Sequence, residues 1–146
     1  MFQPTRLSAR PARPLAALIG SALLAAGCTA TPVQPSADRV ALTLQDCLFR
    51  SDLIKDKLAP GSPRPLTMTA ADGARVTGSC DVAVERLISM GAAKACVDIG
   101  RAHSHVGEAA ERLFAAPGAA DEASLKAAVV KADAAAAACP FTTART

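Results

Sequence analysis

Two histidines, His103 and His105, come closest in this chain to a pair of side chains that could do chemistry together. With Asp98 or Glu108 nearby, they offer nitrogen and oxygen ligands of the kind that zinc and copper take in proteins. Residues two positions apart on a helix point about 200° apart, so the two rings could chelate one ion only from a turn. The alternative is a pair of solvated histidines at a junction between helices. We predict no metal and no cofactor, with His103 and His105 as the candidates if a ligand is bound.

The thiols suggest a different chemistry. Of five cysteines, four lie beyond residue 40: Cys47, Cys80, Cys96 and Cys139. An even number of widely spaced thiols is typical of disulfides in an exported protein, and no C-x-x-C redox pair occurs. Four free thiols are the alternative. We predict two disulfides.

No catalytic motif is present. The sequence contains no Gly-x-Ser-x-Gly, no His-Glu-x-x-His and no phosphate-binding glycine loop. Ser79-Cys80-Asp81 resembles an activated nucleophile only superficially, because Asp81 is well placed to cap a helix and Cys80 to form a disulfide. We therefore predict that the protein is not an enzyme.

The remaining cysteine, Cys28, follows three arginines and a short uncharged segment, residues 15–26. This segment cannot span a bilayer, which needs about 20 apolar residues. It ends in Leu-Ala-Ala-Gly-Cys, which resembles the lipobox of bacterial lipoproteins, with Ala25 where Leu is commonest. The resemblance implies that residues 1–27 are a cleaved signal peptide and that Cys28 carries a diacylglyceryl group. The alternative is an ordinary secretory signal with an incidental cysteine.

Charge and composition limit the partners. The formal net charge of +3 equals the three arginines of the signal peptide, so the chain from Cys28 onward is formally neutral and has no basic excess for nucleic acid. Aromatic residues are scarce, so stacking platforms for bases or sugars are hard to build. Thr29, rather than Asp, follows Cys28, which resembles lipoproteins of the outer membrane that face the periplasm.

Beyond a Pro-containing tether at residues 28–37, the pattern over 38–146 is helical. Apolar residues recur at helical spacing from Val40 to Leu58, predicting a first helix that ends at Ala59-Pro60-Gly61. We expect a long loop over 67–79, with an extended piece at 74–77. Residues 81–116, capped by Asp81, form either one helix or two helices that meet near 100–107, with Gly91 on the buried face.

A last helix is expected from Asp121 to Cys139, with Pro140 ending it. The fold class is therefore all-α: a small alanine-rich bundle of about three to five helices, stapled by two disulfides. If residues 80–96 form one helix, its ends are about 24 Å apart, too far for a disulfide. Cys47 would then bond either Cys80 or Cys96, and Cys139 the other; a break at Gly91 weakens this argument.

Two short segments resemble known helical families. Gly91, Ala95, Ile99 and Gly100 match the first helix of Sel1-like and tetratricopeptide repeats, with His103 where the family has Tyr. That resemblance implies closely nested helix pairs, although no second copy appears at the repeat period. Residues 47–53, Cys-Leu-Phe-Arg-Ser-Asp-Leu, are similar to the first helix of the pilotins of type II secretion, with one extra residue after the cysteine. This second resemblance implies a bundle that holds a partner's peptide helix in a groove.

Together these observations predict a non-enzymatic, membrane-anchored envelope lipoprotein with a structural or protein-interaction role, accessory or pilotin-like. The apolar breadth of the first helix suggests that Phe49, Leu48 and Leu53 contact an envelope protein, in a groove beside residues 81–116. Alternatively, Phe49 covers the end of the bundle or packs under the 59–79 connection. The competing function is a periplasmic metal- or small-ligand-binding lipoprotein that uses His103 and His105.

Overall fold

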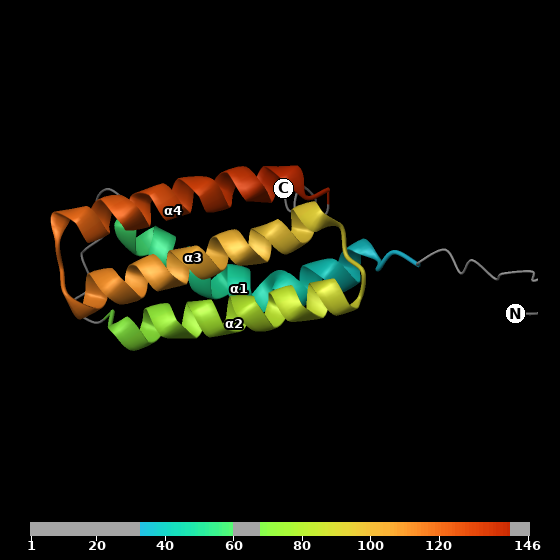
Figure 1. Ribbon diagram of the computed structural model, residues 1–146, viewed down its shortest axis with the longest axis horizontal. Helices are drawn as coiled ribbons and strands as arrows, with labels where there is room; N and C mark the ends of the chain where they lie inside the picture. Colours follow the sequence, from blue (N-terminus) through green and yellow to red (C-terminus); the bar gives the residue numbers. More distant parts are fainter. Residues whose placement is uncertain (1–32, 60–67, 141–146) are drawn as a thin grey trace, which may run out of the picture.

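The computed structural model describes residues 33–59 and 68–140, which form antiparallel helices that run up, down, up and down along one long axis (Figure 1). The helices are α1 (Ala37–Leu58), α2 (Ala70–Ser89), α3 (Lys94–Ala115) and α4 (Ala119–Ala138). α3 packs against all three other helices and is the centre of the bundle. The prediction of an all-helical bundle held by two disulfides is confirmed.

α1 begins and ends close to the positions that the sequence predicts. Ser36 caps it, since its hydroxyl oxygen accepts a hydrogen bond from the Arg39 backbone N–H. The helix ends at Leu58, before Ala59. Its buried face comprises Val40, Leu44, Cys47, Ser51 and Ile54.

The predicted loop over 67–79 is wrong, and so is the extended piece at 74–77, because α2 starts at Ala70. Thr69 and Asp72 form a capping box at this start. The Thr69 backbone N–H donates to the Asp72 carboxylate at 2.8 Å, and the Asp72 backbone N–H donates to the Thr69 side chain. Asp81 therefore lies inside α2 and does not cap a helix.

The break between α2 and α3 lies at 90–93, not near 100–107 as predicted. Gly91 lies in this turn, has φ +71° and is exposed. The prediction that Gly91 lies on the buried face of a helix is therefore also wrong. This left-handed conformation strains any residue with a Cβ, which explains glycine at this position. Gly100 and Gly107 instead lie within α3, on its buried face.

Gly73 on α2 and Gly107 on α3 allow the two helices to approach closely. A Cβ on Gly73 would lie 2.8 Å from the Gly107 carbonyl oxygen, and a Cβ on Gly107 would lie 2.6 Å from the Thr77 backbone nitrogen. Real Cβ atoms essentially never come this close to backbone atoms. α2 and α3 can therefore pack this closely only with glycine at both positions.

α4 starts two residues before the predicted Asp121, with Gly118 as its N-cap. Only Leu125 and Ala132 are buried along its length, and Cys139 directly after it is also buried. Disulfides join Cys47 to Cys80 and Cys96 to Cys139. This agrees with the pairing predicted from helix length, although the helix assumed to separate Cys80 from Cys96 is broken at Gly91.

None of the helices within 33–59 and 68–140 combines the length and apolarity needed to cross a bilayer. The predicted signal peptide and Cys28 lie outside the described residues, as do the start of the tether and residues 60–67 and 141–146.

Candidate interaction surface

α1 carries an exposed apolar stripe directly opposite its buried face. Leu42, Phe49 and Leu53 are 69%, 62% and 43% exposed. Their spacings of seven and four residues place them on one side of the helix. Isolated exposed apolar residues are ordinary on protein surfaces. Three in line on one helix form a continuous apolar strip of the kind that marks an interaction site.

Carboxylates accompany this stripe. At 100° per residue, Asp38, Asp46 and Asp56 fall within about 40° of the line through the apolar residues. All are exposed. Asp46 accepts a hydrogen bond from Nε of Arg50 at 2.8 Å. We call these residues the α1 outward face: Asp38, Leu42, Asp46, Phe49, Leu53 and Asp56.

The predicted partner-binding residues divide between two positions. Phe49 and Leu53 lie on the α1 outward face, whereas Leu48 is half-buried and packs against the core. Because the outward face is opposite the side that packs on α2 and α3, Phe49 points away from the predicted groove beside residues 81–116. Leu42 was not among the predicted partner-binding residues, although its seven-residue spacing from Phe49 places it on the same side of α1.

His103 is buried against Ser51 of α1, beneath a group of charged residues from α1 and α4 that reaches the surface. A hydrogen bond of 2.8 Å joins Nδ1 of His103 to Oγ of Ser51, and which atom donates depends on the ring tautomer. Nearby, Nζ of Lys55 lies 3.1 Å from an Asp52 oxygen and 2.7 Å from an Asp133 oxygen. Burial lowers the pKa of His103 and the Lys55 ammonium lowers it further, while the Asp52 and Asp133 carboxylates oppose both.

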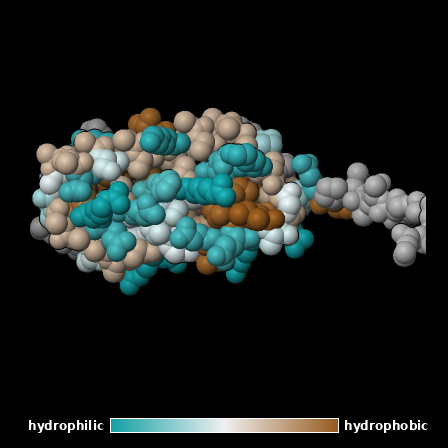
Figure 2. Space-filling model, viewed as in Figure 1, coloured by the Kyte–Doolittle hydropathy of each residue, from teal (hydrophilic) through white to brown (hydrophobic). Residues whose placement is uncertain are grey.

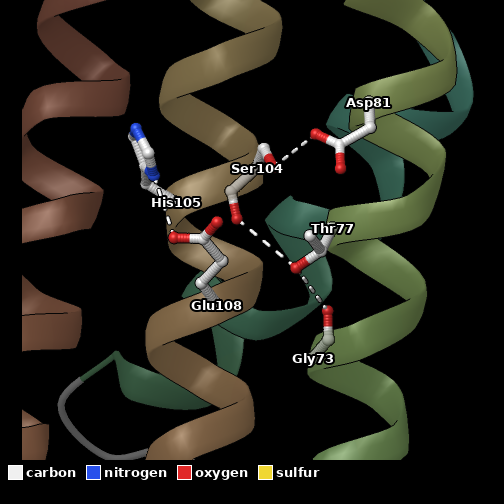
Figure 3. Close-up of polar contacts among 6 residues, drawn as sticks. All are labelled: Gly73, Thr77, Asp81, Ser104, His105 and Glu108. Atoms are coloured by element: carbon white, nitrogen blue, oxygen red, sulfur yellow. Dashed lines mark hydrogen bonds and ion pairs between the residues drawn. The ribbon is translucent and has the colours of Figure 1, made fainter.

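His105 occupies a different side of the same helix. Its Nδ1 lies 3.0 Å from a Glu108 carboxylate oxygen, and its side chain is exposed. Figure 3 shows His105 and Ser104 pointing to opposite sides of α3, with Ser104 directed at α2. Oγ of Ser104 donates to Asp81 at 2.7 Å, and Oγ1 of Thr77 donates to the carbonyl of Gly73 at 3.3 Å. The Ser104–Asp81 hydrogen bond joins α3 to α2, as does a second bond of 3.5 Å from Oγ1 of Thr77 to the Ser104 carbonyl, whereas the Thr77–Gly73 bond lies within α2.

The structure therefore does not bring His103 and His105 together. Both lie inside α3 rather than at a junction, and His103 is buried rather than solvated, which corrects the alternative prediction for that residue. Within the described part of the chain, no group of three or more His, Cys, Asp or Glu residues could hold a metal ion. Cys80, in the sequence Ser79-Cys80-Asp81, forms a disulfide with Cys47 and is therefore not a free thiol.

A second surface is a shallow groove of about 600 Å³ between α3 and α4. Alanines form its floor, and its rim carries charged residues of both signs, among them Arg112 and Lys131. Neither of these two cations forms an ion pair with another described residue. Mixed charge gives this groove no preference for one class of ligand.

Comparisons with protein-family models, curated proteins and solved structures find no match to this chain.

Proposed function

We propose that this chain is a membrane-anchored envelope lipoprotein with a non-enzymatic interaction role, and that the α1 outward face holds its protein partner. The anchor is Cys28, reached after cleavage of residues 1–27, and the location is the periplasmic side of the outer membrane. The observation that carries the proposal is the line of Leu42, Phe49 and Leu53, exposed on a bundle that two disulfides hold rigid.

The chemistry of the face indicates the kind of partner. An apolar strip interleaved with carboxylates fits a protein segment that has apolar side chains in line and Lys or Arg beside them. An amphipathic helix offers both at the same spacing. Aromatic residues in such strips carry a large share of binding free energy, so Phe49 is the expected anchor.

Membrane attachment is tested by intact-mass measurement of the protein extracted from membranes. We expect a mature chain that starts at Cys28 with added lipid mass. An unmodified N-terminus at another residue would exclude the lipoprotein assignment.

Partner binding is tested by crosslinking in intact cells, followed by mass spectrometry that maps the crosslinked residues. Phe49→Asp should weaken the complex by about 30-fold or more, the effect of losing a hot-spot residue worth about 2 kcal/mol. Val130→Asp is the matched control, because Val130 is 68% exposed on α4, away from the α1 outward face.

The proposal requires crosslinks that map to the α1 outward face and to a segment of the partner with apolar and basic residues. Capture of a protein through another surface, or a complex that survives Phe49→Asp, contradicts it.

A further inference from the structure

One end of the bundle is set apart by its closeness to the proposed anchor. The start of α1, the turn between α2 and α3, and the end of α4 all lie at this end, where the described chain begins at Val33 (Figure 1). Between Cys28 and Val33 the backbone spans at most about 18 Å, at about 3.5 Å per residue. A lipidated Cys28 therefore keeps this end beside the headgroups of the bilayer.

Two arginines converge on a hollow at this end. Arg39 from α1 and Arg86 from α2 line an open depression of about 710 Å³, together with Ser36, Thr43 and Ser89. No acidic residue is among the described residues that line it. Neither guanidinium forms an ion pair within the described part of the chain.

This combination is chemically specific. A guanidinium binds phosphate oxygens through two parallel N–H donors, and hydroxyl groups add further donors. The other cations near this end differ: Lys94 and Arg101 both contact the Asp98 carboxylate. Among the described residues that line the hollow, Arg39 and Arg86 are therefore cations without an ion pair, available for an external anion.

Apolar side chains accompany the hollow. Val33, which lines the hollow, is 90% exposed. Ile88, 54% exposed in the last turn of α2, lies at the same end of the bundle but about 200° around the helix from Arg86. Figure 2 shows an apolar area on the visible face toward the end where α2 and α3 meet. Cations and exposed apolar residues at the same end of the bundle match the layered chemistry of a bilayer surface, with phosphates outside and acyl chains below.

We propose that this end of the bundle docks on the bilayer, with Arg39 and Arg86 binding the phosphate of an anionic phospholipid and Ile88 entering the interface. The proposal rests on lipid attachment at Cys28. It makes the protein stand with α1 along the membrane normal, so that the α1 outward face is presented sideways to a partner.

The chain contains no Trp and no Tyr, so one introduced tryptophan reports its own surroundings alone. The lipidated mature protein carrying Ile88→Trp is reconstituted into vesicles of equal parts phosphatidylcholine and phosphatidylglycerol, with bromine on the acyl chains. We expect quenching by the brominated chains. Ala120→Trp, at the opposite end of the bundle at the start of α4, should not be quenched.

Replacing Arg39 and Arg86 by Ala in the Ile88→Trp protein should lower the ratio of docked to undocked protein about 25-fold, since each arginine near an anionic surface contributes about fivefold. Arg112→Ala with Lys131→Ala removes the same charge from the α3–α4 groove and should leave quenching unchanged. Vesicles of phosphatidylcholine alone should give much weaker quenching.

Flotation of the same samples separates the two proposals. The protein could float with the vesicles while Ile88→Trp is not quenched, or while its quenching is unchanged by the arginine substitutions. Either result contradicts the docking and leaves the lipoprotein assignment unaffected. Protein that does not float refutes the anchor, and the docking with it.

Discussion

At the scale of single residues, the glycines of α2 and α3 have opposite roles. Gly73 and Gly107 face each other where the helices touch, and a Cβ on either would collide with backbone atoms of the other helix. Gly78 lies five residues further along α2 and is exposed, with no atom within 4 Å of an added Cβ. The same residue type is therefore required at two sites and merely tolerated at the third.

This contrast predicts substitutions of opposite sign. Gly107→Ala should lower the free energy of unfolding by about 2–3 kcal/mol, because the colliding atoms belong to the backbone and cannot rotate away. Gly78→Ala should raise it by up to about 1 kcal/mol, because Ala is the better helix former. Urea denaturation with the disulfides intact measures both, with the midpoints compared at constant slope. Equal midpoints for the two variants would mean that the helices can separate at little cost.

His103 should make stability depend on pH. Its pKa is lowered in the folded state by burial, so the unfolded chain binds the proton more readily. The stabilisation by neutral His103 is complete above the unfolded pKa of about 6.5 and is lost as pH falls below it, toward the folded pKa. The contribution to the slope is at most about 1.4 kcal/mol per pH unit.

Urea midpoints measured from pH 7.5 down to about pH 5 test this expectation. His103→Gln should flatten the dependence relative to the original protein. His105→Gln, the control at an exposed ring, should keep it. A His103→Gln variant with an unchanged slope would show that this histidine does not supply the effect.

At the scale of helices, the sequence predicts α1 and α4 well and fails at α2. Apolar residues every three or four positions define α1, whereas residues 67–79 contain two glycines and few large apolar side chains. That composition favours a loop when local propensity alone is considered. Tertiary packing reverses it, because Gly73 gains from contact with α3 what it loses in helix propensity.

The residues next to the start of α2 nevertheless carry a signal for a helix N-terminus. Thr69 and Asp72 have the spacing of a capping box, and that signal predicts a helix from residue 70. The turn at Gly91 had an ambiguous signal. Glycine after a helical run is typical of a helix end, but Gly100 and Gly107 offer the same residue type further along the chain.

In the candidate site, helical periodicity predicts which side of α1 is buried, and therefore that Phe49 and Leu53 on the opposite side are exposed. His103 continues the buried helical spacing of Ile99, Val106 and Ala110, so periodicity could have indicated its burial. Its hydrogen bond to Ser51, 52 residues away, has no local signal.

The two disulfides should stabilise different helices. Cys47–Cys80 joins α1 to α2, and Cys96–Cys139 joins the start of α3 to the end of α4. Each closes a long loop, so loss of either should lower the free energy of unfolding by about 3–4 kcal/mol. α1 packs less extensively than α2 and α3 do against each other, so it depends more on its disulfide.

Amide hydrogen exchange on paired Cys→Ala variants tests this assignment. Removing Cys47 and Cys80 should speed exchange mainly in α1. Removing Cys96 and Cys139 should speed it mainly in the second half of α4, where Ala132 is the one buried helical residue beyond Leu125. Uniform acceleration across the bundle in both variants would contradict local roles.

At the scale of the whole molecule, the proposed anchor, the arginine hollow and the α1 outward face follow one axis. α1 starts at the end where the described chain begins and runs along the length of the bundle (Figure 1). The hollow of Arg39 and Arg86 lies at that end, and the exposed line from Leu42 to Leu53 extends away from it. A short tether would therefore fix both the distance of the bundle from the membrane and the direction of its partner-binding face.

Lengthening that tether should separate the two proposed contacts. Inserting about ten Gly and Ser residues after Ala30 roughly triples the linker between Cys28 and Val33, and the effective concentration of headgroups at the hollow then falls about fivefold, following the −3/2 power of linker length. Brominated-lipid quenching of Ile88→Trp should decrease accordingly in vesicles. The complex that depends on Phe49 should persist in cells, since the α1 outward face is still exposed on a folded bundle. Undiminished quenching would show that the end binds the bilayer strongly without help from the tether, and loss of the complex would show that the partner recognises the bundle only at a fixed height above the membrane.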